Sequence, residues 1–441
     1  MSAIDEPPQP GTELPRLVTR PPGEHSRTFL VRHRHSAAPM GPAKAGGGIV
    51  YATATGANVT DVDGNRYVDL AAGFGAELIG HGHPGVRRAL ALQSERLLHA
   101  LGDVHPSDAK IALCDRLAAL HPEPDAQVLV GQSGSDAVSA ALKTAVLSTN
   151  KTGVLAFAGA YHGLGYGPLS ACGLRPSYRE PFAAQLNPRV SFVAYPDASE
   201  RAAAVLDEVA RVLATATNDV GAILVEPVLG RGGVIVPPPG FLAELGRLAH
   251  AHGALLIADE IWTGLGRSGA WLRSVADGAQ PDLICLGKGL GGGLPLSAVV
   301  GRRSVMAAWR RADEVVETST FAGAPLACAT ALATLDALGR EKLVERSARL
   351  GAAWLAEIAG ALREVKRATV RGAGLMLGID LGAHAGAAIA AVRSLLESGF
   401  IASTGGGARE VVVLTPPLTI AERQLEAATA AVIEAVRESV G

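Results

Sequence analysis

The stretch Leu283-Ile284-Cys285-Leu286-Gly287-Lys288-Gly289 places a lysine just after a short apolar run. Upstream, the run Ala254-Leu255-Leu256-Ile257-Ala258 ends in the acidic pair Asp259-Glu260. Short apolar runs bounded by glycine and charged residues are typical of strands buried on both faces. The sequence therefore predicts an α/β protein in which an amine and a carboxylate lie at the ends of two buried strands.

The composition is that of a folded, soluble chain. Of the 441 residues, 48% are hydrophobic and 19% are charged, and the formal net charge is −2. This length exceeds what one hydrophobic core usually supports, so we expect two domains. Lysine and arginine form no block or stripe, so we expect neither nucleic acid nor a membrane surface as a partner.

Cysteine usage bears on the cellular compartment. The four cysteines, Cys114, Cys172, Cys285 and Cys328, have neither CxxC nor metal-ligand spacing, so no metal site is expected. Scattered thiols suit a reducing compartment. The sequence shows no signal-peptide pattern and no apolar run long enough to span a bilayer. We therefore expect a cytoplasmic protein.

Apolar runs alternate with helical periods through the middle of the chain, at 127–130, 153–157, 191–194, 222–225, 254–258 and 283–286. Strands separated by helices need crossover connections, which predicts a mainly parallel sheet. We expect a mobile Pro/Gly-rich arm at 1–25 and an N-terminal segment at 26–60 that joins the small domain. The large domain would span 61–330, and a small α+β domain would span 331–441.

Two glycine-containing motifs follow these runs. Gly131-Gln132-Ser133-Gly134-Ser135-Asp136-Ala137 opens a helix, where free N–H groups and the helix dipole would bind a phosphate. Small residues at a helix start are also ordinary N-caps, so both interpretations stay open. Tyr161-His162-Gly163 follows the run at 153–157. It is either an aromatic pair that packs on a flat ring or a half-buried pair in a loop.

Lys288 and Asp259 together fit one cofactor, pyridoxal 5′-phosphate. Its aldehyde needs a lysine amine, and its ring nitrogen needs a carboxylate that keeps it protonated. Each residue has an ordinary alternative, a helix N-cap for Asp259 and a solvated loop lysine for Lys288. The glycines around Lys288 lack the spacing of a P-loop.

In their order and joint presence, these motifs resemble the class III (ornithine/4-aminobutyrate-like) aminotransferases of pyridoxal-phosphate fold type I. The resemblance runs from about residue 45 to the end and is carried by segments 80–84, 133–137, 161–163, 226–228, 256–269, 281–296, 318–323 and 416–418. It implies an α/β fold with a mainly parallel central sheet in a large domain and a smaller α+β domain.

The resemblance also implies roles around the cofactor ring. Lys288 would form a Schiff base with the cofactor and later move a proton. Asp259 would pair with the ring nitrogen. Tyr161 would stack on the ring, with His162 close by and Glu226 as a supporting acid.

Further implied roles concern the phosphate and the partner subunit. Gly134 and Ser135 would hold the phosphate. Thr320 would reach the phosphate of the neighbouring subunit's cofactor, so the resemblance implies a homodimer with shared active sites, with a tetramer as the alternative.

Three positions depart from the family's pattern. Relatives that act on amino acids carry a glutamate where this chain has Arg231, and an arginine where it has Val413. We expect Arg231 to bind a substrate carboxylate, and the alternative is an arginine that faces solvent or bonds a local carbonyl. Trp262 stands where relatives often have a glutamine that contacts the cofactor. These changes favour amines or ω-amino acids as donors.

The favoured activity is therefore transamination from a primary amine or ω-amino acid to a keto acid or aldehyde. The alternative is another pyridoxal-phosphate reaction on the same scaffold, as in aminomutases, racemases, decarboxylases and phospho-lyases. A non-enzymatic regulator or scaffold is a third hypothesis, but such a protein would have no need of Lys288.

Overall fold

The computed structural model describes residues 10–39, 48–215, 219–311, 315–382, 384 and 386–441. A sheet of seven strands lies at its centre, in the order β4-β10-β9-β8-β7-β5-β6. β10 runs antiparallel to both of its neighbours, and the other pairings are parallel. The strands are β4 Gln127–Gly131, β5 Gly153–Phe157, β6 Val190–Val193, β7 Val220–Val225, β8 Leu255–Asp259, β9 Leu283–Leu286 and β10 Ser297–Gly301.

This sheet confirms the mainly parallel α/β fold. Each of the six apolar runs became a strand, with ends that differ by no more than two residues. The seventh strand, β10, was not expected from the sequence. It inserts between β4 and β9 and hydrogen-bonds to both, so the strands that carry Lys288 and the 131–137 motif are not adjacent.

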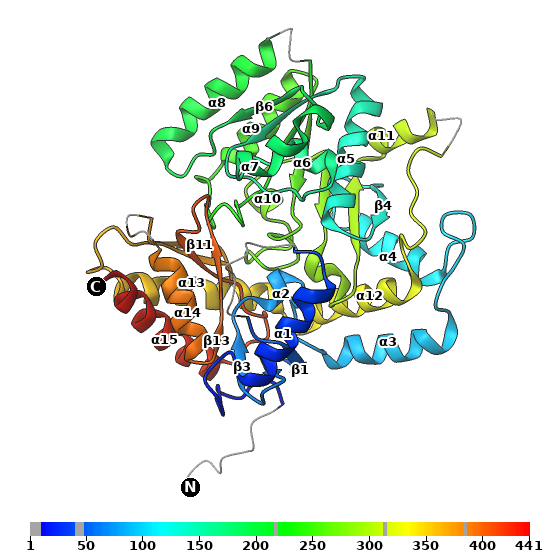
Figure 1. Ribbon diagram of the computed structural model, residues 1–441. Helices are drawn as coiled ribbons and strands as arrows, with labels where there is room; N and C mark the ends of the chain where they lie inside the picture. The colour runs from blue at the N-terminus through cyan, green and yellow to red at the C-terminus, as the bar shows by residue number, and fades with distance from the viewer. Residues whose placement is uncertain (1–9, 40–47, 216–218, 312–314, 383, 385) are drawn as a thin grey trace.

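Helices bury both faces of the sheet, which explains why its strands read as continuous apolar runs. On β5, Val154 and Ala156 pack on the side of α5 (Gly134–Thr149), whereas Leu155 and Phe157 pack on the opposite side. α8 (Ser199–Ala214) and α9 (Phe241–Ala251) cover that second side. Figure 1 shows α8 and α9 in the upper part and α5 to their right.

Two smaller sheets complete the molecule. One is antiparallel, in the order β11-β12-β15-β14, and the other has the order β1-β2-β3-β13. In the second sheet, β13 pairs in parallel with β3, so the hairpin near residue 60 joins a strand near residue 400. The strands are β1 Tyr51–Thr55, β2 Asn58–Asp61, β3 Arg66–Asp69, β11 Thr369–Gly372, β12 Leu377–Asp380, β13 Phe400–Ile401, β14 Ser403–Gly405 and β15 Val411–Leu414.

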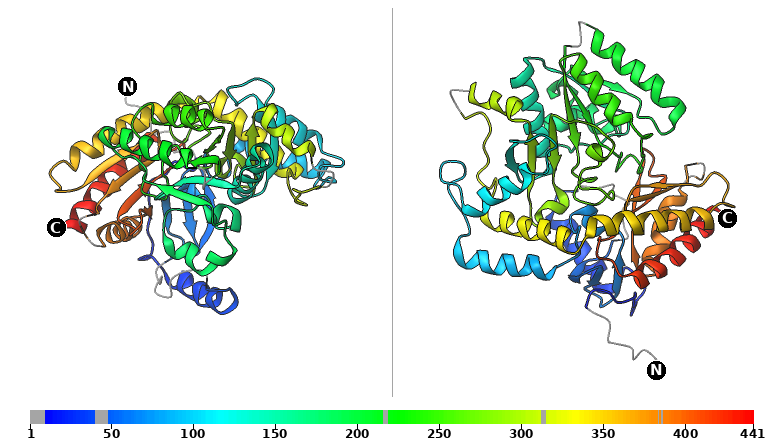
Figure 2. Two further views of the ribbon diagram at one scale, coloured as in Figure 1. Left: turned by 90° about the horizontal axis from the view of Figure 1, so that it is seen from above. Right: turned by 180° about the vertical axis from the view of Figure 1, so that it is seen from behind.

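Long helices pack around these sheets, and Figure 2 shows the N-terminal strands beside the C-terminal elements. They are α1 Glu24–Ser36, α3 Pro84–Arg96, α4 Asp108–Ala118, α12 Pro325–Arg340, α13 Leu343–Ala361, α14 Ala387–Glu397 and α15 Glu422–Val440. Short helices are α2 Ala72–Gly75, α6 Tyr166–Ser170, α7 Pro176–Arg179, α10 Arg273–Ala276 and α11 Arg303–Met306, with 3-10 turns η1 Glu180–Gln185, η2 Lys288–Gly291 and η3 Ala307–Arg311.

The N-terminal segment makes specific contacts where the sequence predicted a mobile arm. The backbone N–H of Arg16 donates to the carbonyl oxygen of Arg66 at 2.9 Å, and that of Val18 donates to the Asn65 side chain at 2.8 Å. Residues 1–9 of the predicted arm lie outside the described residues. The division at 26–60, 61–330 and 331–441 stays a prediction, and β3, within 61–330, pairs with β13 of the C-terminal segment.

Among the described residues, no helix combines the length and apolarity that a membrane crossing would need.

Candidate active site

Eight of the residues singled out in the sequence line one cavity of about 270 Å³. They are Gly134, Ser135, Tyr161, His162, Glu226, Asp259, Trp262 and Lys288, and Gly163, Leu164 and Ile261 complete the lining. The cavity lies beyond the carboxyl ends of β4, β5, β7, β8 and β9, because each lining segment directly follows one of these strands. This is the usual position of a site in a parallel α/β sheet.

A larger hollow of about 620 Å³ lies between α5, α6 and Trp309. Its lining is mainly apolar, and Lys143 is the charged side chain among the described residues that line it. It lacks the facing amine and carboxylates of the smaller cavity, so the acid–base chemistry belongs to the smaller one.

Lys288 follows β9 by two residues and has a φ of 47°, a left-handed conformation that a non-glycine residue rarely adopts. Such backbone strain is often found at functional sites. Its Nζ lies 4.7 Å from the centre of the Trp262 ring. Burial lowers the pKa of Lys288, the negative charges of Asp259 and Glu226 oppose that shift, and Arg231 adds to it.

Asp259 ends β8 and pairs with a histidine from the segment after β5. Its Oδ2 lies 2.7 Å from His162 Nδ1, and its Oδ1 accepts the backbone N–H of Ile261 at 3.2 Å. Both Asp259 and His162 are buried. The carboxylate therefore has a fixed orientation at the edge of the cavity.

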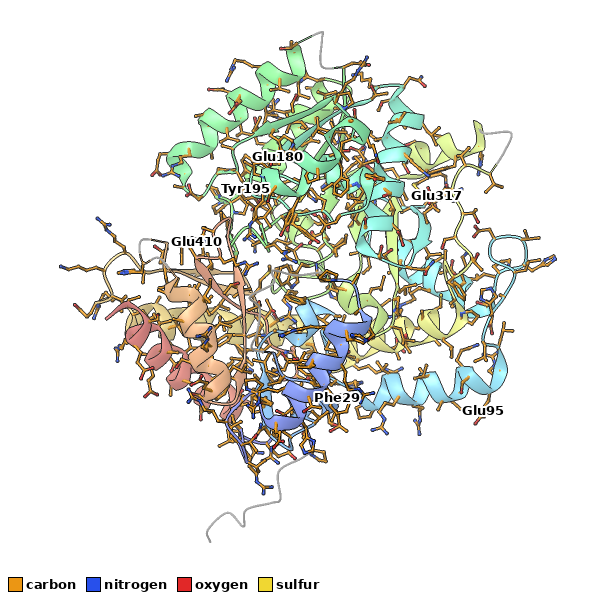
Figure 3. All side chains as sticks on the ribbon, viewed as in Figure 1. Phe29, Glu95, Glu180, Tyr195, Glu317 and Glu410 are labelled. Carbon is orange, nitrogen blue, oxygen red and sulfur yellow. The ribbon has the colours of Figure 1, made fainter. Side chains whose placement is uncertain are left out.

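Glu226 follows β7 and is held by backbone groups from two loops. Its Oε1 accepts the N–H of Tyr161 at 2.7 Å, and its Oε2 accepts the N–H of Gly230 at 3.0 Å. Tyr195, labelled in Figure 3, donates its hydroxyl to the Glu226 carbonyl oxygen at 2.9 Å. Burial, with a smaller contribution from the charge of Asp259, raises the pKa of Glu226 to about 7.

The start of α5 forms the wall nearest β4. Ser133 caps the helix by a reciprocal pair of bonds with Asp136, so the ordinary N-cap interpretation is correct for Ser133. The phosphate interpretation rests on Ser135, whose Oγ accepts the N–H of Gly165 at 3.2 Å and lines the cavity. Gly163 has a φ of 108°, and a Cβ there would lie 3.0 Å from the Cβ of Ser135.

Arg231 lies next to the cavity and stacks on an aromatic ring. Its Cζ is 4.6 Å from the centre of the Tyr161 ring and 6.0 Å from that of Phe74. Its side chain forms no hydrogen bond or ion pair with the described residues, so neither a local carbonyl nor a carboxylate holds it. Burial raises the pKa of Tyr161, and the charge of Arg231 opposes that shift.

Trp262 and Val413 belong to one small apolar cluster. Its buried members are Val228, Val234, Trp262, Met376, Val411 and Val413. Gly230 makes room for the indole, because a Cβ on Gly230 would lie 2.3 Å from Trp262 Cε3. The wall of the site that contains Trp262 is therefore backed by apolar side chains.

Thr320 is exposed and does not line the cavity of its own chain. The adjacent Ser319 accepts a hydrogen bond from Gln132, and Glu317, labelled in Figure 3, pairs with Lys143 of α5. The segment that carries Thr320 is thus held by Gln132 and by α5, and Thr320 itself is exposed.

The sequence patterns assign no role to Ile261 or to Phe74. Ile261 lines the cavity beside Gly134, where a Cβ would lie 2.9 Å from its Cδ1. Its position two residues after Asp259 is the sequence feature that could have predicted its place in the cavity. Phe74 gave no such signal, because its position depends on an unusual backbone turn.

The sequence model of the class-III aminotransferases matches residues 42–436 of this chain. This chain belongs to the class-III aminotransferase family.

Named relatives of this aminotransferase span nearly its whole length. An acetylornithine aminotransferase of Methanopyrus kandleri is 38% identical over 387 residues, which cover 87% of this chain and 93% of that protein. An alanine/serine racemase of Pyrococcus horikoshii is 30% identical over an alignment of 465 residues, which covers 97% of this chain and 94% of that protein. Among solved structures, this chain is similar to the PLP-bound amine transaminase from an uncultivated Pseudomonas species. The TM-score is 0.84 at 29% sequence identity, and the match covers 92% of this chain and 98% of that chain.

These matches confirm the predicted family, fold type and cofactor. The aminotransferase uses pyridoxal 5′-phosphate and moves an amino group from an amine donor to a keto acid acceptor. The cavity residues fit that cofactor. His162 Nε2 and Trp262 Nε1 are buried without a hydrogen-bond partner among the described residues, as expected where a polar molecule completes the site.

The raised pKa of Glu226 predicts a specific pH dependence of stability. The folded chain keeps the Glu226 proton up to a pKa of about 7, whereas the unfolded chain releases it near the ordinary glutamate pKa of 4.5. Between these values the folded state binds more protons, so rising pH lowers the free energy of unfolding. We expect Glu226→Gln to remove this dependence, so that the melting temperature of the variant relative to wild type rises between pH 5 and pH 8.

Thermal unfolding of the cofactor-free proteins measures that difference. Glu95→Gln is the matched control, because Glu95 is exposed on α3, as Figure 3 shows. A difference for Glu226→Gln that stays constant with pH would contradict the prediction.

Proposed function

We propose that this aminotransferase takes amino groups from primary amines or ω-amino acids and passes them to a keto acid or aldehyde, with Lys288 as the catalytic base. The observation that carries the proposal is the convergence of Lys288, Asp259 and Glu226 on one cavity at the strand ends. Pyridoxal phosphate, when bound there, supplies an aldehyde for the amino group and a ring that accepts electrons.

Each polar residue then has a chemical task. Asp259 would hold a proton on the cofactor's ring nitrogen, and His162 fixes the Asp259 carboxylate through their 2.7 Å contact. Tyr161 would pack against the cofactor ring. Gly134 and Ser135 hold the phosphate at the start of α5, where free N–H groups and the helix dipole favour an anion.

Lys288 moves the proton at the substrate Cα. Burial lowers its pKa, so a larger neutral fraction of the amine is available as a base near neutral pH. Glu226 has its pKa raised to about 7, so it is not a permanent counter-ion that would keep Lys288 protonated. Its two backbone hydrogen bonds fix its position, and burial, which raises its pKa against them, suits it to the role of a supporting acid.

Arg231 and the apolar cluster define the substrate. The guanidinium stacks on Tyr161 and has no acceptor among the described residues, so its N–H edges are available to a carboxylate. Trp262 lines the cavity, and Val413 packs in the apolar cluster behind it. A donor with its carboxylate distant from the amine, or a primary amine without one, suits this arrangement better than an α-amino acid held at position 413.

A second copy of this chain completes the site in our proposal. Large apolar side chains are exposed beside the segment that carries Thr320, among them Leu98 at 59%, Leu101 at 63%, Val104 at 72% and Phe321 at 59%. Such a patch is typical of a protein–protein interface. We propose a homodimer in which Thr320 contacts the partner's cofactor phosphate.

We also propose a cytoplasmic location. The four cysteines are all free, and three of them are buried, which suits a reducing compartment.

A second candidate activity is racemisation, because the Pyrococcus horikoshii relative that matches almost the whole chain is an alanine/serine racemase. Both activities begin with loss of the Cα proton. In transamination the amino group would stay with the cofactor and the donor would leave without it, whereas in racemisation a proton would return to the opposite face of Cα and the amino acid would leave with its amino group.

A half-reaction panel separates the two activities. Holoenzyme is mixed with primary amines, ω-amino acids, alanine and serine in the absence of an acceptor. We expect primary amines and ω-amino acids to convert bound cofactor stoichiometrically to its pyridoxamine form, as seen by absorbance and mass. Lys288→Ala should slow this conversion by at least about a thousandfold. Inverted alanine or serine without any pyridoxamine form would refute transamination in favour of racemisation.

Arg231 should discriminate between donors that differ only in a carboxylate. Because a bidentate ion pair in a partly buried site is worth about 1.5–3 kcal/mol, we expect Arg231→Ala to lower the kcat/KM preference for an ω-amino acid over the matched amine by about 10- to 100-fold. Arg231→Lys, which keeps the charge but loses the planar fork, should fall in between. Equal losses on both donors would show that Arg231 does not bind the carboxylate.

The dimer proposal is tested with hybrid proteins. Thr320→Val, which removes only the hydroxyl, should weaken cofactor binding in its own homodimer. In a hybrid with a Lys288→Ala chain, the remaining Lys288 site receives a native Thr320 from the partner, so its cofactor dissociation constant should return to the wild-type value. If the Lys288 site of the hybrid binds the cofactor as weakly as the Thr320→Val homodimer does, or if the protein sediments as a monomer, the shared site is ruled out.

A further inference from the structure

A left-handed turn at residues 72–75 packs against Trp262 and Lys288, which line the cavity. Ala72, Gly73, Phe74 and Gly75 have φ values of 46°, 57°, 56° and 88°, four positive values in succession. Left-handed conformations are unfavourable for L-residues with a Cβ, and two of the four are not glycine. Figure 1 shows this turn as α2, between the N-terminal strands and the large domain. Interactions from outside the turn must therefore hold it in place.

Asp69 and His81 provide these interactions. Asp69 ends β3, and its Oδ1 accepts the backbone N–H groups of both Ala71 and Ala72 at 2.9 Å. Its Oδ2 lies 2.9 Å from His81 Nε2. Asp69 is fully buried, so its orientation depends on these partners. His81 belongs to the Gly80–Pro84 motif, and the proposed reaction gives it no direct task.

The turn delivers two residues to the active site. A Cβ on Gly75 would lie 2.6 Å from Trp262 Nε1 and 3.4 Å from Lys288 Cδ, so the backbone itself packs against both side chains. Phe74 faces Arg231, with 6.0 Å between the ring centre and Cζ. Phe74 is 60% exposed, but its ring lies beside the guanidinium of Arg231. The Arg231 side chain has no polar partner among the described residues.

We propose that Phe74 is a specificity-determining residue. It forms the outer wall of an aromatic clamp that holds Arg231 in position to bind a substrate carboxylate. Asp69 and His81 are positioning residues, because they hold the left-handed turn that carries Phe74. This inference rests on the proposed role of Arg231. Tyr161 is the inner wall of the clamp. The two rings restrict the guanidinium plane and limit its contact with water, while its N–H edges stay available to bind a carboxylate bidentately.

The first arm of the test measures donor preference in Phe74 variants of the holoenzyme. The readout is kcat/KM for an ω-amino acid divided by kcat/KM for the amine of the same length. We expect Phe74→Ala to lower this ratio by about 5- to 20-fold, mainly through KM of the carboxylated donor. Phe74→Leu keeps apolar bulk without a ring and should lie nearer to Phe74→Ala than to wild type. An unchanged ratio in Phe74→Ala would overturn the proposal.

The second arm tests the positioning residues. His81→Asn removes the contact with Asp69, and His83→Asn is the matched control because asparagine still caps α3. We expect His81→Asn to lower the donor ratio as Phe74→Ala does, and His83→Asn to leave it within about twofold. In the Phe74→Ala/His81→Asn double variant the two effects should not add, because both act through one turn. Additive effects would show that His81 acts by another route and would overturn its assigned role.

Failure of this inference and failure of the Arg231 proposal give different results. If Arg231→Ala keeps the wild-type donor ratio, the proposed carboxylate site is wrong. If Arg231→Ala lowers the ratio and Phe74→Ala does not, Arg231 binds the carboxylate without the clamp, and only the present inference fails. Retained cofactor content and melting temperature in each variant exclude misfolding as the cause.

Discussion

The balance of charge inside one cavity is the constraint on which this active site depends. Burial by itself would neutralise both Lys288 and Glu226, by lowering the pKa of the amine and raising that of the carboxyl group. The negative charge of Asp259 favours the protonated amine and disfavours a second carboxylate beside it. This coupling works because β7, β8 and β9 are neighbours in the sheet, so that its hydrogen bonds hold the three groups close to one another. The aminotransferase therefore needs its sheet for electrostatics as much as for stability.

The strands that could be predicted from the sequence are those marked by a residue pattern within the segment itself. Strands buried on both faces form continuous apolar runs, so β5 at 153–157 and β9 at 283–286 could be located within a residue. The two-residue strand β13 had no comparable signal, because its pairing depends entirely on the distant β3. β10 was missed because it directly follows the glycine-rich segment around Lys288, where local patterns favour a loop.

The same distinction holds in the active site. Lys288, Asp259 and Glu226 each follow an apolar run, and the sequence could place them at strand ends. The stack of Arg231 on Tyr161 joins two loops, and no spacing along the chain encodes it. The position of Phe74 is harder still, because nothing in the identity of an alanine or a phenylalanine predicts a positive φ. The residues proposed to set specificity thus depend on contacts between segments, whereas the amine and carboxyl groups of the cavity depend on the ends of strands.

The parallel pairing of β3 with β13 has a consequence for how the enzyme forms during synthesis. All seven strands of the central sheet lie between residues 127 and 301, so a growing chain contains them before the C-terminal strands exist. β3 pairs locally with β2, but its other edge is completed only by β13, where the N–H of Leu70 donates to the carbonyl oxygen of Ile401. Long loops of this kind close late in folding. The turn after β3 is among the first parts of the chain to be synthesised, yet it lies next to a strand pairing that can form only once residue 401 has been made.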